Sequence, residues 1–148
     1  RDTGHTLKTK EDFTEATIKA MDNPYLDMIT HPIQREYPLD LEKVGEAAAD
    51  KNRILELNAS SYRKKKAHMR GIKTEALKML RLADKYGFKI AVNSDAHFYK
   101  NIGEYSDLKF ILESSDFKKE LIMNHSAESV MNYLRNKKNR LKKLEKTV

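Results

Sequence analysis

Three side chains that follow predicted strands could together bind a metal ion. Asp95 and His97 stand two residues apart, directly after the apolar segment 89–92. On an extended chain this spacing points both side chains to the same side, so they can ligate one metal ion or two neighbouring ions. His31 follows an earlier predicted strand. Imidazole and carboxylate ligands without sulfur suit zinc, manganese or iron, which can polarise a phosphoryl oxygen and generate hydroxide. The three residues therefore point to hydrolase chemistry.

Several polar residues near these strand ends also have a purely structural interpretation. His31 precedes Pro32, and a His-Pro pair taken alone is more often a turn than a ligand. Glu56, inside an apolar strand, could be a buried carboxylate satisfied by the backbone or by a charged partner. His125 could help Ser126 to begin a helix. The sequence leaves these alternatives open.

Strands and helices alternate along the chain. Helix signals are a capping box at Thr9 and Asp12, an N-cap at Asp40, a C-cap at Gly87 and an N-cap at Ser126. Apolar residues at helical spacing stand next to each of these signals, and another such group lies around residues 108–112. Strands are expected at residues 25–30, 53–58, 89–92 and 120–123.

This alternation predicts an α/β fold with parallel strands, in an open doubly wound sheet or as part of a barrel. Four strands cannot close a barrel. The polar residues all lie at the carboxyl ends of the strands, where parallel sheets and barrels build their sites because the loops converge there.

Length and composition narrow the class of protein. The 148 residues fit one domain or a piece of one, and 39% hydrophobic with 34% charged residues is typical of a soluble folded chain. Without an apolar run of about 18 residues, no membrane partner is expected. The absence of cysteine excludes thiolate ligands and a cysteine nucleophile, and it favours a cytoplasmic setting. Because the chain opens at Arg1 with a polar stretch, we expect a fragment.

The net charge of +7 comes mainly from the C-terminus. Residues 135–148 hold seven of the 29 Lys and Arg residues and one of the 22 Asp and Glu residues, which leaves 22 basic and 21 acidic residues elsewhere. We expect a basic terminal helix at 135–148, most simply a solvated amphipathic helix. Because the rest of the chain is nearly neutral, nucleic acid is not expected as a partner.

Five segments, in their order, resemble the later part of the PHP (polymerase and histidinol phosphatase) superfamily, and among its members most closely the YcdX-like phosphatases. They are YLDMITHP, YPLDLEKVGEAAADKNRILELNASS, YGFKIAVNSDAHF, NIGEY and LIMNHSAESVMNYL. The order of HP, E-x-N-x-S-S and SDAH carries the resemblance, which extends from about Tyr25 to Leu134.

The resemblance implies a distorted (β/α)7 TIM-like barrel with a divalent metal cluster at its carboxyl end. Residues 1–148 would form a single partial PHP domain, the C-terminal half of that barrel. His31, Asp95 and His97 would be metal ligands, with Asp95 and His97 also catalytic, and His5 would be a further ligand. Zinc is the first expectation for the metal, with manganese and iron as alternatives.

The resemblance also implies a phosphatase that hydrolyses phosphate esters of small molecules through a metal-activated hydroxide. Arg70 would bind the substrate phosphate, with Arg63 as the competing candidate, while Asn58 and Ser60 would orient ligands or substrate. Departures from the family pattern include Thr30 and Ile33, which stand where glycines usually flank the HP motif.

The remaining expectations concern what completes the site. The family's H-x-H pair and its metal-bridging glutamate belong to an N-terminal half that these residues do not include. We therefore expect a fragment that is nearly inactive alone and that pairs with the missing half or with a second copy of itself, because a half barrel leaves strand edges uncovered. The alternative function is a PHP module associated with a DNA polymerase or nuclease, binding nucleic acid through the basic C-terminal helix.

Overall fold

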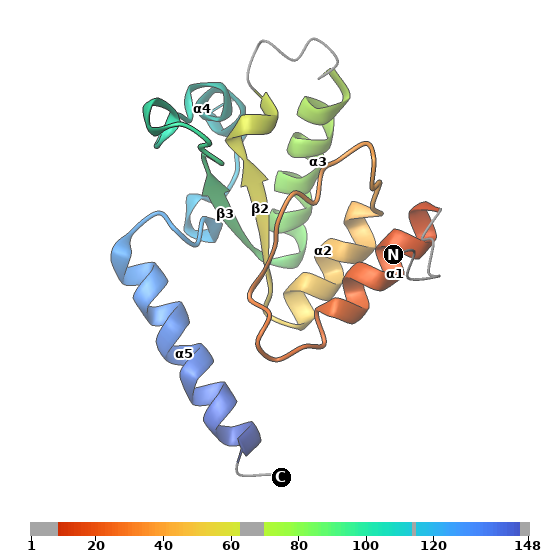
Figure 1. The fold of residues 1–148 in the computed structure, drawn as a ribbon, viewed down its shortest axis with the longest axis vertical. Coiled ribbons are helices and arrows are strands. Elements are labelled where there is room, and N and C mark those ends of the chain that lie inside the picture. Colours follow the sequence, from red (N-terminus) through yellow and green to blue (C-terminus); the bar gives the residue numbers. More distant parts are fainter. Residues whose placement is uncertain (1–8, 63–69, 114, 146–148) are drawn as a thin grey trace.

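A computed structural model describes residues 9–62, 70–113 and 115–145, in which helices and strands alternate (Figure 1). The strands are β1 (Met28–Ile29), β2 (Ile54–Asn58) and β3 (Lys89–Asn93). The helices are α1 (Lys10–Ala20), α2 (Leu41–Asp50), α3 (Arg70–Tyr86), α4 (Ser106–Glu113) and α5 (Ala127–Glu145). Short 3-10 turns occupy Ala59–Tyr62, Tyr99–Asn101 and Lys119–Leu121.

The three strands form one parallel sheet in the order β1-β2-β3. Met28 pairs with Ile54 at the β1–β2 boundary, and the β2–β3 register runs from Ile54 opposite Lys89 to Asn58 opposite Asn93. Since all three strands point the same way, their carboxyl ends lie at one edge. The predicted α/β fold with parallel strands is confirmed for the part of the chain that the structure describes.

The expected fourth strand at residues 120–123 is wrong. Part of this segment is a 3-10 turn, and its β-type pairing with the sheet is one isolated parallel bridge between Ile90 and Ile122. Beyond that bridge the side chain of Asn124 takes the place of a backbone partner, since its Oδ1 accepts from Val92 N at 3.0 Å and its Nδ2 donates to Val92 O at 2.8 Å. A side chain that satisfies the β3 backbone in this way ends the ladder.

The first strand is also shorter than the expected residues 25–30. Asn23 starts a turn in which its Oδ1 accepts from Tyr25 N at 3.0 Å and its carbonyl accepts from Leu26 N at 3.1 Å. Both amides are therefore used locally and cannot pair with β2. The strand consequently begins only at Met28.

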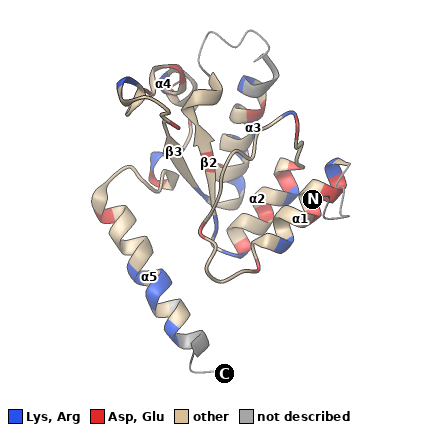
Figure 2. Cartoon of the chain, in the orientation of Figure 1, with Lys and Arg blue, Asp and Glu red and all other residues tan. Residues whose placement is uncertain are grey.

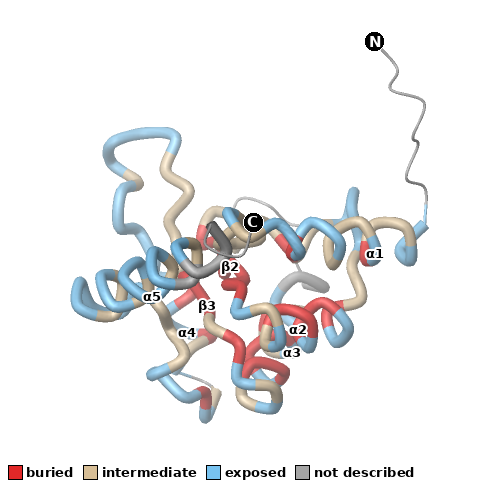
Figure 3. The backbone as a smooth tube through the Cα atoms, turned by 90° about the horizontal axis from the view of Figure 1, so that it is seen from below, coloured by how far each residue is buried: buried red, intermediate tan, exposed pale blue. Residues whose placement is uncertain are grey.

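Strand β2 is buried along its whole length because it lies between the other two strands. Its side chains alternate between the two faces of the sheet. Leu55 and Leu57 belong to the main apolar core, together with buried residues of α2 and α3. Glu56 and Asn58 occupy the opposite face, and both are buried. Figure 3 shows the buried residues concentrated in β2, β3, α2 and α3, whereas α1 and α5 are mostly intermediate or exposed.

The predicted helix signals are confirmed. Thr9 and Asp12 form the capping box of α1, and the Ser126 hydroxyl accepts from Ser129 N at 3.1 Å at the start of α5. Gly87 follows α3 with φ of +80°, a conformation that glycine adopts without a steric penalty. Within the described ranges, no helix has both the length and the apolar character needed to cross a membrane.

Helix α5 extends away from the sheet and its covering helices (Figure 1). It begins at Ala127, ahead of the predicted basic segment 135–148. Its Tyr133 hydroxyl donates to Asp27 Oδ1 at 3.2 Å, and Lys137 Nζ pairs with Asp27 Oδ2 and donates to Tyr25 O at 3.0 Å. These contacts attach the helix to the segment that leads into β1. Figure 2 shows basic residues along the later part of α5, and both signs of charge on the rest of the chain.

The Asp40→Ala variant is expected to be less stable by about 1 kcal/mol at neutral pH, because Asp40 is the N-cap of α2. Its Oδ1 accepts from the backbone amides of Glu42 at 3.1 Å and Lys43 at 3.3 Å. Burial acts to raise the pKa of Asp40, but these amides, with the charges of Lys10 and Lys43, hold it below its ordinary value.

Because the folded pKa is lowered, this stabilisation is present above the ordinary Asp value of 3.8 and is lost as pH falls through the folded pKa. Urea unfolding of wild type and variant at pH 7 and at acidic pH measures the difference. Asp50→Ala, at the other end of α2, is the control and should change stability little. An equal loss in both variants would contradict the capping role.

Candidate functional site

The carboxyl edge of the sheet brings together the polar residues that end its three strands. His31 follows β1, Asn58 ends β2 with Ser60 close behind, and Asp95 follows β3. The parallel register makes this meeting unavoidable, because Asn58 lies directly opposite Asn93, two residues before Asp95. The predicted gathering of polar residues at this edge is confirmed for these strands.

Asp95 is the centre of this group. Its Oδ2 accepts from the Ser60 hydroxyl at 2.8 Å and lies 3.9 Å from His31 Nε2. Its Oδ1 lies 3.8 Å from His97 Nδ1. The two imidazoles thus approach different oxygens of one carboxylate, whose side chain is 28% exposed.

The expectation that Asp95 and His97 lie on extended chain is wrong. Asp95 has φ of +46°, in the left-handed region, so the chain turns at this residue. His97 Nδ1 lies 3.0 Å from the carbonyl oxygen of Asp95, and the His97 side chain is 78% exposed. The imidazole still comes near the carboxylate, but the tight turn achieves this rather than the alternation of a strand.

His31 also has a left-handed backbone, with φ of +49°. This conformation costs a non-glycine residue on the order of 1 kcal/mol, so the surroundings must hold it in place. The buried Glu56 does so by accepting from His31 N through Oε2 at 2.9 Å. Three non-glycine residues in the described ranges have positive φ. Two of them are His31 and Asp95, whose side chains approach each other to 3.9 Å.

Glu56 has the structural role that the sequence left open. Glu56 is only 6% exposed. Its second carboxylate oxygen, Oε1, accepts from Asn93 Nδ2 at 2.9 Å. Both oxygens are thus occupied, one by the backbone next to His31 and the other by the end of β3. The carboxylate links the ends of all three strands.

Asn58 orients both the histidine and the loop that carries Ser60. Its Oδ1 accepts from Ser60 N at 2.7 Å and from Ser61 N at 3.3 Å, which closes a turn directly after β2. Its Nδ2 lies 3.2 Å from His31 Nδ1. One amide side chain therefore fixes the position of the Ser60 hydroxyl and contacts the imidazole opposite it.

The electrostatics favour a charged carboxylate at Asp95. Hydrogen bonds from Ser60 and Asn58 hold the pKa of Asp95 below its ordinary value against the effect of burial, and the nearby His31 and His97 lower it further. An ionised carboxylate is the form that binds a metal ion.

The donor atoms fit a divalent metal ion in kind but only partly in arrangement. His31 with Asp95, and His97 with Asp95, have donor atoms less than 4 Å apart, a separation that two ligands of one ion with bonds of about 2 Å can span. Among the described residues, however, no group of three His, Asp or Glu side chains lies close enough together to hold an ion. His5 and Arg63 lie outside the described ranges, and only the backbone of Arg70, at the start of α3, is described.

A protein-family model described as PHP-associated matches residues 74–106, which include β3, Asp95 and His97. Residues 74–106 are therefore similar to a PHP-associated region. The resemblance to the PHP superfamily that the motifs indicate is thereby confirmed.

Curated relatives of this chain are named probable phosphatases. The chain is 36% identical to one from Acetivibrio thermocellus, with 92% of this chain and 55% of the relative aligned. It is 36% identical to one from Clostridium novyi (87% and 52%) and 35% identical to one from Caldanaerobacter subterraneus (86% and 49%). The chain therefore spans about half the length of the curated relatives it matches. Phosphatase function is supported for this group.

One participant in the PHP-associated site was not anticipated. Asn93 ends β3, lies opposite Asn58 and donates to Glu56. It was detectable, because it is a polar residue at the end of an apolar strand, as Asn58 is. The predicted strand stopped one residue short of it, at Val92.

Proposed function

We propose that this chain forms part of the active site of a metal-dependent phosphatase that hydrolyses phosphate esters of small molecules. The observation that carries the proposal is the Asp95 carboxylate, which lies within 4 Å of His31 and of His97 at the carboxyl edge of the sheet. The names of the relatives and the PHP-associated match support the phosphatase part of this proposal.

His31, Asp95 and His97 would hold the divalent metal, and His5 would add a further ligand. Zinc suits this donor set best, and manganese or iron also fits it. When bound, such an ion supplies Lewis-acid polarisation of the phosphoryl oxygens and activation of water.

The residues of the chain itself would orient and charge this site. The Ser60 hydroxyl fixes one oxygen of Asp95, and Asn58 contacts the His31 ring while holding the Ser60 loop. Asp95 would remain ionised and would not need to lose a proton before binding. Arg70, or Arg63 in the preceding segment, would pair with the substrate phosphate, because a guanidinium offers two parallel donors to phosphate oxygens.

We further propose that the parallel sheet is part of a (β/α)7 barrel completed by further polypeptide, either the other half of the same protein or a second copy. Two observations support this. The chain spans about half the length of its curated relatives. Within the described ranges, β1 is an edge strand that pairs with β2 on one side and with no strand on the other. On this proposal the chain alone would turn over little substrate, because it supplies only part of the ligand set.

Elemental analysis of the purified chain tests the metal site directly. Bound zinc, manganese or iron is expected in the wild type after loosely held ions are removed, and it should disappear in Asp95→Ala and His97→Ala. His125→Ala is the matched control, since His125 is an exposed histidine outside the proposed site, and its Nδ1 lies 2.6 Å from Ile122 O. Metal that persists in the first two variants, or that is lost equally in the control, would contradict the proposed site.

A chain that binds no metal at all would be tested again with the other half added. If metal is still absent from that combination, the metal-dependent phosphatase is excluded. If metal appears only there and disappears with Asp95→Ala, the proposal is supported, and the site is one that two segments must build together.

A further inference from the structure

A pocket of about 550 Å³ opens beside His31, and we propose that it binds the aromatic leaving group of the phosphate ester. This inference rests on the proposed function and adds the chemical class of the substrate. The volume lies within the range of about 300 to 1,000 Å³ that is typical of small-molecule sites.

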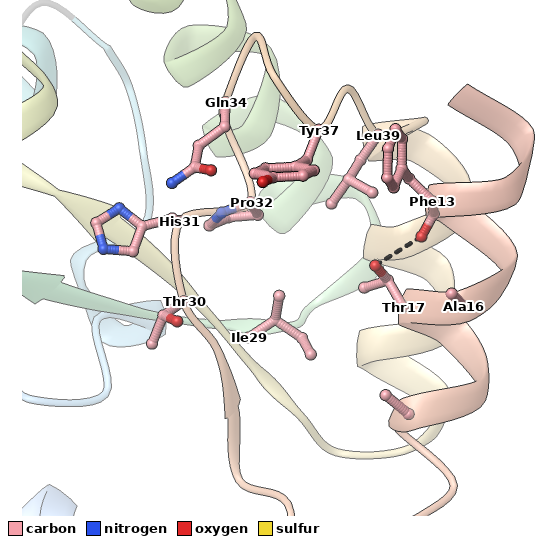
Figure 4. Close-up of a pocket in the computed structure, with 11 residues that line it drawn as sticks. Phe13, Ala16, Thr17, Ile29, Thr30, His31, Pro32, Gln34, Tyr37 and Leu39 are labelled. Atoms are coloured by element: carbon pink, nitrogen blue, oxygen red, sulfur yellow. Dashed lines mark hydrogen bonds between the residues drawn. The ribbon is translucent and has the colours of Figure 1, made fainter. Parts of the chain in front are cut away.

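The pocket lies between α1 and the segment that leaves β1 (Figure 4). Phe13 and Ala16 line it from α1, Ile29 from β1, and Tyr37 and Leu39 from the segment before α2. The Phe13 and Tyr37 rings meet edge to face, with centroids 5.4 Å apart and planes at 87°. Two aromatic side chains thus form one end of a mainly apolar wall.

The pocket and the proposed phosphoester site share His31. Thr30, His31 and Pro32 line the pocket and also form the turn that brings the His31 ring close to Asp95. Figure 4 shows His31 at one end of the pocket and α1 at the other, with the Gln34 amide extending on the His31 side. A phosphate held near His31 and Asp95 would therefore leave its ester group directed along this wall.

The lining selects an uncharged and largely apolar group. No Lys, Arg, Asp or Glu is among the residues that line the pocket, and the polar atoms come from Thr, Gln, Tyr and His side chains. A sugar or a second phosphate would lose its hydration there and find few partners. A planar ring would gain contact with the Phe13 and Tyr37 rings, which favour offset or edge-to-face packing. The geometry thus favours an aryl phosphate over a sugar phosphate.

Two probes separate this inference from the proposed function. 1-Naphthol carries only the aromatic group, whereas 1-naphthyl phosphate carries the group and the phosphate. Both are titrated into the 148-residue chain, with amide chemical shifts of α1 and residues 29–39 as the readout. Both are expected to shift residues that line the pocket, and the phosphate ester should also shift His31 and Asp95.

A variant that fills the pocket provides the decisive comparison. Ala16→Phe places a ring in the pocket from α1 and should weaken both probes about tenfold, the equivalent of about 1.4 kcal/mol. Glu15→Phe adds the same ring to an exposed position of the same helix, outside the pocket, and should leave both affinities within about twofold of the wild type.

The outcomes are distinguishable. If 1-naphthol binds in the pocket and the phosphate adds nothing, the preference of the pocket for an aromatic group is supported, while the phosphatase proposal and the role of that group as a leaving group are contradicted. If only 1-naphthyl phosphate binds, and Ala16→Phe does not weaken it, the aromatic pocket is excluded while the phosphate site survives. The inference also fails if neither probe binds, or if the wild-type chain self-associates and Ala16→Phe abolishes that association, because the pocket would then be a contact between copies.

Discussion

The Glu56→Ala variant is expected to lose about 3 kcal/mol of unfolding free energy, because it removes a buried carboxylate that accepts from two donors at the ends of the neighbouring strands. Glu56 accepts from His31 N and from Asn93 Nδ2, both at 2.9 Å, on a residue only 6% exposed. Asn93 Nδ2 would keep only Met28 Sδ, a weak acceptor 4.0 Å away. The removed side chain also leaves a void in the sheet face between β1 and β3.

Urea unfolding at neutral pH measures this loss. Glu46→Ala is the matched control, since Glu46 is an exposed glutamate on α2, and it should change stability by less than about 0.5 kcal/mol. Glu56→Gln keeps one acceptor and should fall between the wild type and Glu56→Ala. A Glu56→Ala variant as stable as the Glu46→Ala control would show that the carboxylate does not link the strands.

The same variant should also change the local conformation of His31. Its left-handed backbone is held by the Glu56 hydrogen bond, so removing the acceptor allows the residue to relax toward negative φ. Backbone chemical shifts of His31 would report this change in a variant that remains folded. The imidazole would then move away from Asp95, which connects a stability effect in the sheet with the proposed metal site.

Local signals made much of the fold predictable. Thr9 with Asp12, Asp40, Gly87 and Ser126 act at the ends of helices through contacts within a few residues, so their types in the sequence were sufficient. The β2 and β3 segments were found because continuous apolar runs are typical of strands buried in a parallel sheet.

Prediction from hydrophobic periodicity failed where asparagine residues bond backbone groups that strand pairing would otherwise use. The segment 120–123 is as apolar as a strand, but Asn124 bonds both backbone groups of Val92 and ends the pairing. At β1, Asn23 uses the amides of Tyr25 and Leu26 in a turn. Neither event alters hydrophobic periodicity, so periodicity alone overestimated both strands.

The meeting of the polar residues at the carboxyl edge of the sheet was predictable, whereas their geometry was not. Polar residues at the carboxyl ends of parallel strands must meet, which is why His31, Asn58 and Asp95 were found. The left-handed conformations of His31 and Asp95 carried no sign in the sequence, because histidine and aspartate usually occupy negative φ. These two turns decide which oxygen of Asp95 each histidine approaches.

Ser60→Ala is expected to weaken binding of zinc to the chain by about 10- to 100-fold, on the proposal that Asp95 is a ligand. The Ser60 hydroxyl donates to Asp95 Oδ2 at 2.8 Å, and this is the oxygen that lies 3.9 Å from His31 Nε2. Without the hydroxyl, the carboxylate keeps the hydrogen bond from Asn58 but loses the donor that fixes Oδ2, so the pair of donor atoms is less well preorganised. Competition with a chromophoric chelator measures the dissociation constant.

The neighbouring serine supplies the control for this experiment. Ser61 lies in the same 3-10 turn, and its backbone amide bonds Asn58 Oδ1 as Ser60 N does. Ser61→Ala therefore keeps the turn and the Ser60 hydroxyl, and its zinc affinity should stay near that of the wild type. Ser60→Thr restores a hydroxyl and should recover most of the loss. If Ser60→Ala and Ser61→Ala weaken zinc equally, the turn as a whole rather than the bond to Asp95 supports the metal, and the orientation of the carboxylate must come from Asn58 and the left-handed backbone.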